Sequence, residues 1–298
     1  MRPIPLLLVA IALLGGCGGE SEPPEGVQRL ALDFQPNAVH AGLIAGDPIV
    51  PASSTDSLKL LLARRVDMAV VDIHDLGLAR ERGEDVVGVG ALVQRPLAAV
   101  IASGEIARPR ELEGKRVGVT GLPSDDAVLR AIVEHDGGDY SKVRRTTIGF
   151  SAVPSLIAGK VDAVVAFWNA EGVALRQRGV DTHEFRVDDY GAPRYPELVL
   201  AVRGATLRRR PDQVRATLGR LRHATIVALR DREVTIDRLV RASGADEALM
   251  RAQLDAVAPA LLPPMRLDRA ALEGWAEFDA RFGILPRRPD VDETFPRG

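Results

Sequence analysis

Short apolar runs alternate with amphipathic segments of helical length along most of the chain from Val27 onward. The apolar runs have the length of strands: Leu30–Leu32, Ile49–Val50, Val66–Val71, Val86–Leu92, Ala98–Ala102, Val117–Val119, Thr146–Ile148, Val161–Phe167 and Leu198–Val202. The helical segments between them span residues 37–45, 53–64, 72–83, 125–135 and 151–158. This alternation predicts an α/β fold with mostly parallel sheets flanked by helices.

One arrangement occurs twice. Residues 61–71 and 156–165 both contain a helix end, a turn, a Val-Asp pair and an apolar strand. Two copies of one supersecondary unit suggest two lobes of similar build, although the copies are too different to be called a sequence repeat. From Pro211 onward the pattern is helical, with helices expected at 214–229, 235–242, 246–256 and 268–282.

These elements predict a two-lobed molecule with a cleft between the lobes. The first lobe is expected to comprise residues 27–105, the second 106–200, and the helices of 201–298 are expected to complete the first lobe. Crossover segments near 94–110 and 190–204 would connect the lobes. Binding proteins that close about a hinge have this layout.

The N-terminus has the layout of a bacterial export signal. A basic start precedes an apolar run from Ile4 to Leu14, and Leu14-Gly15-Gly16-Cys17 matches a lipobox. We therefore expect a signal peptide over 1–16, a lipidated Cys17 and a flexible tether over 17–26. A chance cysteine is the alternative, but Cys17 is the only cysteine of the chain. The lipid would hold the exported protein on the outer face of the cell membrane.

Composition excludes several classes of function. The net charge is −2 and the chain has no basic block, which argues against nucleic acid as a partner. A single cysteine excludes an internal disulfide. The five histidines show no spacing typical of metal ligands, and no serine lies in a nucleophile motif. We expect no metal, no cofactor and no catalytic residues.

Candidate ligand-binding residues cluster where two predicted strands end, because ligands of α/β sheets bind beyond the carboxyl ends of strands. Phe34, Asn37 and His40 follow the first strand, and Trp168, Asn169 and Glu171 follow the strand at 161–167. Phe34 and Trp168, one from each lobe, would sandwich a flat ring. Ordinary core packing explains Phe34 equally well, helix capping explains Asn37, and a structural role explains His40.

Six further candidates are polar residues near predicted element ends, namely Ser54, Thr55, Asp72, Ser124, Tyr195 and Glu197. Ser54, Thr55 and Ser124 lie at predicted helix starts, where free backbone amides can bind an anionic group. Helix capping alone also explains these three residues. Asp72 is either a cap or a ligand acceptor. Glu197 would accept hydrogen bonds from an exocyclic amine, and Tyr195 would stack or donate.

Several motifs resemble those of the solute-binding proteins for thiamine pyrimidine precursors. The segment Asp33-Phe34-Gln35-Pro36-Asn37, followed by His40, resembles the opening motif of that family, in which a Trp more often stands at the Phe34 position. The later motifs are Ala91–Leu97, Gly121–Asp125, Trp168–Gly172 and Tyr190–Glu197. The resemblance implies a type II periplasmic-binding fold and a monomer that delivers a hydroxymethylpyrimidine-type ligand to an ABC permease and its ATPase.

Four alternatives remain open. Binders of riboflavin or of aliphatic sulfonates share the fold that the resemblance implies. A pyrimidine-forming enzyme of eukaryotes also shares it, but its pyridoxal-phosphate lysine has no counterpart in Val66–Val71, and its cysteine-rich motif is absent. A lipid-anchored sensor without a transport role is the fourth alternative.

Overall fold

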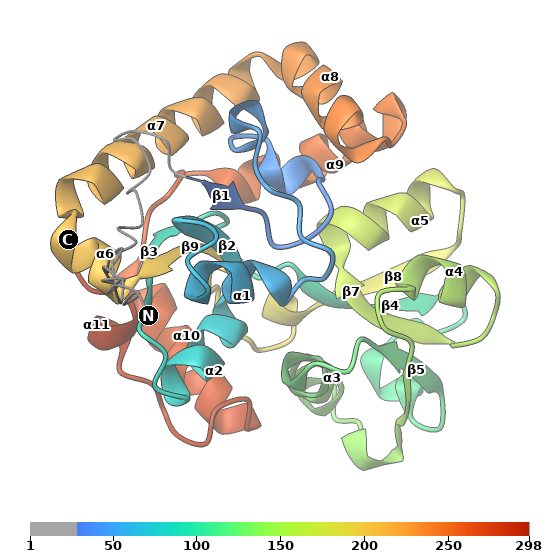
Figure 1. The fold of residues 1–298 in the computed structure, drawn as a ribbon. Helices are drawn as coiled ribbons and strands as arrows, with labels where there is room; N and C mark the ends of the chain where they lie inside the picture. Colours follow the sequence, from blue (N-terminus) through green and yellow to red (C-terminus); the bar gives the residue numbers. More distant parts are fainter. Residues whose placement is uncertain (1–28, 298) are drawn as a thin grey trace, which may run out of the picture.

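The computed structural model describes residues 29–297. The predicted signal peptide, Cys17 and the tether lie outside the described residues. No helix of the described chain combines the length and apolar character needed to span a membrane. Two β-sheets with flanking helices make up the molecule (Figure 1).

The first sheet has the strand order β1-β2-β9-β3 and the second has the order β6-β5-β7-β4-β8. The strands of the first are β1 (Leu30–Ala31), β2 (Met68–Asp72), β3 (Val86–Ala91) and β9 (Leu198–Arg203). Those of the second are β4 (Ala98–Ser103), β5 (Arg116–Val119), β6 (Arg144–Thr147), β7 (Ala163–Phe167) and β8 (Thr182–Arg186).

Each sheet is parallel except for one reversed strand. In the first sheet β9 runs antiparallel to β2 and β3, and in the second sheet β4 runs antiparallel to β7 and β8. Each reversed strand comes directly after the chain has crossed from one sheet to the other, after β3 and after β8. The reversed strands therefore begin where β2 and β7 end. In each sheet, the end of a parallel strand and the start of the reversed strand lie at the edge that faces the other sheet.

Helices cover both sheets. Those before β9 are α1 (Asp56–Leu62), α2 (Ile73–Glu81), α3 (Pro123–His135), α4 (Ala152–Ile157) and α5 (Val173–Gln177). The later ones are α6 (Gly204–Arg209), α7 (Pro211–Arg230), α8 (Arg232–Ser243), α9 (Glu247–Val257), α10 (Arg269–Phe282) and α11 (Val291–Thr294). Although α7 and α8 lie beside the first sheet in Figure 1, α9 also contacts α5 and α10 contacts α3. The C-terminal helices thus touch elements of both sheets.

The predicted helix at 37–45 was wrong. Two short 3-10 turns, Ala38–His40 and Ile44–Gly46, occupy this stretch. The segment packs closely on α7, where a Cβ at Gly42 would lie 2.1 Å from the hydroxyl of Thr225. Tertiary contact at this point overrides the local helical pattern. The predicted strand at Ile49–Val50 is reduced to one bridge, between Ala31 and Ile49.

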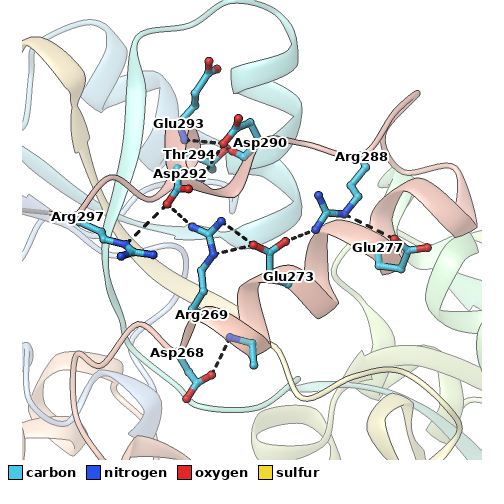
Figure 2. Close-up of polar contacts among 11 residues, drawn as sticks. Asp268, Arg269, Glu273, Glu277, Arg288, Asp290, Asp292, Glu293, Thr294 and Arg297 are labelled. Carbon is cyan, nitrogen blue, oxygen red and sulfur yellow. Dashed lines mark hydrogen bonds and ion pairs between the residues drawn. The ribbon is translucent and has the colours of Figure 1, made fainter.

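Helix α10 is positioned from both of its faces. On the solvent side, Arg269 bridges Glu273 of the same helix and Asp292 of α11 (Figure 2). On the buried side, Trp275 lies against Gly77 of α2, where a Cβ would come within 2.9 Å of the indole. The missing side chain lets α10 approach α2 closely. This approach places Asp279 beneath the end of β2, next to His74.

Candidate functional site

A cavity of about 140 Å³ lies between the two sheets, lined by residues from both. Asp33, Phe34 and Asp72 line it from the first sheet, and Asp125 and Glu171 line it from the second. Drug-sized ligands occupy pockets of roughly 300–1,000 Å³. The volume therefore suits a small ligand with a single ring.

The floor of the cavity is formed where β2 ends and β9 begins. Glu197, directly before β9, is buried, and its Oε2 accepts hydrogen bonds from the backbone amides of Leu97 (2.8 Å) and Ala98 (3.2 Å). Asp72 caps α2 by accepting the amide of His74 at 2.8 Å. Burial raises the pKa of both carboxyl groups, although the nearby His74 opposes this shift. Burial therefore makes the ionised form of both groups more costly than it is in water.

A buried histidine lies beneath this floor. His74 Nδ1 lies 2.7 Å from Asp279 Oδ1, and its Nε2 lies 3.9 Å from Glu197 Oε1. Burial disfavours the charged ring, but Asp279, Asp72 and Glu197 together raise the pKa of His74 to about 10. The ring is therefore an imidazolium at neutral pH, and Tyr195 packs edge-on against it at 5.2 Å.

The side wall of the first sheet carries a second buried carboxylate–histidine pair. Asp33 Oδ1 lies 2.6 Å from His40 Nε2, and His40 Nδ1 accepts the backbone amide of Asn37 at 3.2 Å. Because Nδ1 accepts, Nε2 carries the proton and donates it to Asp33. His40 is fully buried, so it acts behind the cavity and orients Asp33, which lines it.

On the opposite wall, Asp125 in the first turn of α3 binds the loop that leads into the helix. Asp125 Oδ2 accepts from the hydroxyl of Thr120 (2.6 Å) and from the amides of Gly121 (2.9 Å) and Leu122 (3.2 Å). An anionic ligand would have to displace this carboxylate. With the Asp125 carboxylate in this position, the wall is a poor site for a sulfonate or phosphate, although Ser124 lines the cavity there.

Two aromatic rings meet at the cavity, one from each side. The ring centroids of Phe34 and Phe150 lie 5.0 Å apart with planes tilted by 33°. Both line the cavity, and Phe150 is 52% exposed. Nearby, Glu171 belongs to a π-helical turn, Trp168–Gly172, and its Oε2 accepts the amide of Phe167 at 3.1 Å. Burial raises the pKa of Glu171.

The structure brings most of the predicted site residues to this cavity. Those that line it are Phe34, Asn37, Ser54, Asp72, Ser124, Glu171 and Glu197. The predicted residues that are not among its lining are His40, Thr55, Trp168, Asn169 and Tyr195. Except for Thr55, these last residues are buried behind the cavity walls.

The placement of Trp168 corrects the predicted sandwich with Phe34. The indole is 2% exposed, its N–H donates to the carbonyl of Pro96 at 3.0 Å, and the Arg186 guanidinium stacks on it at 4.2 Å. Trp168 thus joins β7 to the first crossover between the sheets. The ring opposite Phe34 is Phe150, which sequence reasoning missed.

The polar lining residues that the sequence prediction missed are Asp33, Asp75, Thr120 and Asp125. Asp33 lies inside the quoted motif, and Asp125 ends another. A search for carboxylates beside predicted strand ends would have found both. With them, the charged residues that line the cavity are all acidic: Asp33, Asp72, Asp75, Asp125, Glu171 and Glu197, without a Lys, Arg or His among the described lining residues.

The floor also has the donor set of a metal site. One ligand atom each of Asp72, His74 and Glu197 lies within 4.8 Å of the others. Asp279 on the far side of His74 resembles the carboxylate that supports a metal-binding histidine. The imidazolium form of His74 has no lone pair for a metal, so an ion would first have to displace a proton.

Comparisons with known proteins identify the family of the chain. A family model described as NMT1/THI5 like matches residues 44–233. The chain is 34% identical over 214 residues to the formylaminopyrimidine-binding protein of Halalkalibacterium halodurans, over 65% of this chain and 64% of that protein. It is 24% identical over 198 residues to a 4-amino-5-hydroxymethyl-2-methylpyrimidine phosphate synthase of Schizosaccharomyces pombe, over 61% of this chain and 56% of that enzyme. The matches span less than two thirds of either relative.

Solved structures share the fold. The alkanesulfonate-binding protein SsuA from Xanthomonas axonopodis pv. citri, bound to MOPS, superposes with a TM-score of 0.72 at 18% identity. The superposition covers 91% of this chain and 98% of that one. The chain therefore has the two-lobed α/β fold of periplasmic solute-binding proteins. At this identity the likeness concerns the fold alone.

Proposed function

Because the chain belongs to the NMT1/THI5-like family, we propose that it is the solute-binding protein of an ABC importer. In this proposal it captures a thiamine pyrimidine precursor of the aminopyrimidine type between its lobes and delivers it to the permease and its ATPase. The name of the relative from Halalkalibacterium halodurans supports this ligand class.

The observation that carries the proposal is the lining of the cavity. It combines a volume of about 140 Å³, two facing phenylalanines and, among the described lining residues, charged side chains that are all acidic. An aminopyrimidine is one flat ring whose edge carries N–H donors. Aromatic faces would stack on the ring, and carboxylate oxygens would accept from its edge.

The same lining speaks against the rival ligands. A sulfonate would meet repelling carboxylates, and the amides of Gly121 and Leu122 before α3 are occupied by Asp125. Riboflavin has three fused rings, and a cavity of about 140 Å³ suits one ring better than three.

A binding role is also better supported than catalysis. The synthase of Schizosaccharomyces pombe is less similar than the binding protein. The strand that the lysine of the pyrimidine-forming enzyme would occupy has the sequence Met-Ala-Val-Val-Asp in β2.

We further propose that the protein works as a monomer on the outer face of the cell membrane, held there by a lipid on Cys17. The lobes would comprise residues 27–105 with 201–298, and residues 106–200. Closure about the two crossovers would bring the walls of the cavity together. This arrangement also accounts for a cavity whose walls come from two sheets.

The decisive test is calorimetry and thermal shift with a panel of aminopyrimidines, thiamine, riboflavin and aliphatic sulfonates. A ligand at a hundred times its dissociation constant stabilises a protein by ~2.7 kcal/mol. We expect this effect for aminopyrimidines. Stabilisation by sulfonates or riboflavin alone would overturn the proposal. If aminopyrimidines bind but no permease takes them up from the protein, a sensor role would be favoured.

A further inference from the structure

The floor of the cavity holds more buried negative charge than it neutralises. Asp72, Glu197 and Asp279 surround a single cationic group, His74. Asp75 also lines the cavity on the same side, and Tyr195 packs against His74 without adding positive charge. Buried carboxylates are costly unless they are paired or protonated. One more cation, or protonation of the carboxyl groups, would therefore stabilise the cluster.

In each of the two floor carboxyl groups, Asp72 and Glu197, one oxygen is fixed by backbone amides and the other is not. In Asp72, Oδ1 is bound to the amide of His74, and in Glu197, Oε2 is bound to two amides. Among the described residues, no hydrogen bond is made to Asp72 Oδ2, and the nearest cationic atom to Glu197 Oε1 is His74 Nε2 at 3.9 Å. These oxygens are fixed acceptors that no protein donor satisfies.

The ligand chemistry that fits is a planar cation with adjacent N–H donors. A neutral aminopyrimidine presents one exocyclic amine beside a ring nitrogen that only accepts. Protonation of that ring nitrogen gives two neighbouring donors and a positive charge, which is the pattern that carboxylates bind most strongly. The charge would also offset the excess of acidic groups on the floor.

We propose that this protein binds its pyrimidine as the ring-protonated cation, held on Asp72 and Glu197; this inference rests on the proposed function. The proton moves from a floor carboxyl group to the ring nitrogen. The carboxyl group becomes a carboxylate, the ring becomes a pyrimidinium, and no other bond changes. Planar amidinium cations belong to the same ligand class.

The His74–Asp279 pair acts on this step as a positioning unit. His74 does not line the cavity, but its backbone amide orients Asp72 and its charge lies beside Glu197. Acidic groups on the other walls already have partners: Asp33 is paired with His40, and Asp125 accepts hydrogen bonds from Thr120, Gly121 and Leu122.

The test is nitrogen NMR of an aminopyrimidine with isotopically labelled ring nitrogens, in a mildly alkaline buffer where the free ligand is neutral. In the complex, one ring nitrogen should resonate at the position of the protonated ring. A complex of good affinity whose nitrogens keep the neutral positions would overturn the inference and leave the proposed function standing. Absence of binding would overturn both.

Variants assign the proton to the floor. Glu197→Gln should lower the affinity at least about tenfold and return the bound ring to the neutral position. Asp72→Asn should act in the same way and serves if the first variant does not fold. Glu113→Gln, at a partly exposed glutamate paired with Lys142, is the matched control and should keep both affinity and nitrogen positions. A protonated ring in both floor variants would overturn the assignment.

A zinc titration tests whether the floor binds a metal ion instead of a pyrimidinium cation. Protein freed of metal by a chelator should bind zinc weakly and should keep its affinity for the pyrimidine. Stoichiometric zinc binding that competes with the pyrimidine and is lost in Glu197→Gln would show that the floor is a metal site, which would overturn the proposal.

Discussion

Nε2 of His40 lies 2.6 Å from Oδ1 of Asp33, and both residues are buried at the edge of the cavity. The other ring nitrogen accepts the amide of Asn37. The ring is thereby fixed at both ends. This contact explains why both residues occur in the same sequence motif. Asp33 lines the cavity, whereas His40 lies behind it and orients the Asp33 carboxylate.

Replacing His40 should therefore weaken binding through Asp33. His40→Gln replaces the rigid ring, whose two nitrogens bind Asp33 and the amide of Asn37, with a flexible amide, so the Asp33 carboxylate loses its fixed buried partner. We expect a loss of ~1–3 kcal/mol in unfolding free energy and a weaker affinity, measured by urea denaturation and calorimetry. Asp33→Asn in the His40→Gln background should then cost little more affinity. Additive losses in the double variant would contradict a shared role.

The rings that meet at the cavity should determine affinity for flat ligands. Removing Phe34 or Phe150 deletes one aromatic face, and aromatic pairs contribute ~0.5–1.5 kcal/mol beyond their burial. Phe150→Ala should weaken aminopyrimidine binding about tenfold, which is ~1.4 kcal/mol, with little change in stability because the side chain is half exposed. Unchanged affinity in calorimetry would remove Phe150 from the site.

Trp168 should instead affect stability. Trp168→Phe keeps an aromatic ring but loses the hydrogen bond to Pro96 and part of the packing under Arg186. We expect a loss of ~1–3 kcal/mol in unfolding free energy. The ligand affinity of the folded protein should be nearly unchanged. An affinity loss as large as that of Phe150→Ala, without a loss of stability, would show that Trp168 contacts the ligand.

Most strands and long helices followed from the sequence, because alternation of apolar runs and amphipathic segments is a local signal. The strand β8 was missed because Thr182–Arg186 carries His, Glu and Arg, and only its pairing with β4 makes it a strand. The helix at 37–45 failed for a similar reason, since packing of Gly42 on α7 decides its conformation.

Candidate site residues were predictable as far as they lie at strand ends. Asp72, Glu171 and Glu197 line the cavity for that reason. Phe150 was not predictable, because it follows the edge strand β6 and only the three-dimensional arrangement brings it to Phe34. Trp168 follows β7 directly, but its side chain turns toward the crossover at Pro96, and strand position alone does not give that direction.

The lipid anchor gives a prediction that is independent of the cavity. If Cys17 is lipidated, Cys17→Ser should release the protein from the membrane fraction into the soluble fraction without changing its ligand affinity. Fractionation followed by calorimetry measures both. A variant that stays in the membrane fraction would contradict the lipoprotein proposal and leave the binding function untouched.

Stability should fall as the pH rises from neutral to alkaline, because of His74. Its pKa in the folded protein is raised to about 10, above the ordinary value of 6.5, so the folded state keeps a proton that the unfolded chain releases. The stabilisation is complete below pH 6.5 and is lost progressively as the pH rises to about 10. The raised pKa values of Asp72 and Glu197 act in the same direction at lower pH, since the folded state again holds the additional protons.

Urea unfolding measured across this range checks the prediction. The slope of unfolding free energy against pH should flatten in His74→Gln, whose mean stability is also lower because Asp279 loses its buried partner. His223→Gln, at an exposed position of α7, is the matched control and should keep the slope of the unsubstituted protein. Equal slopes in all three proteins would show that His74 is neutral in the folded state. The cavity floor would then lack its internal cation, and Asp72 and Glu197 would have to be protonated for the empty protein to be stable.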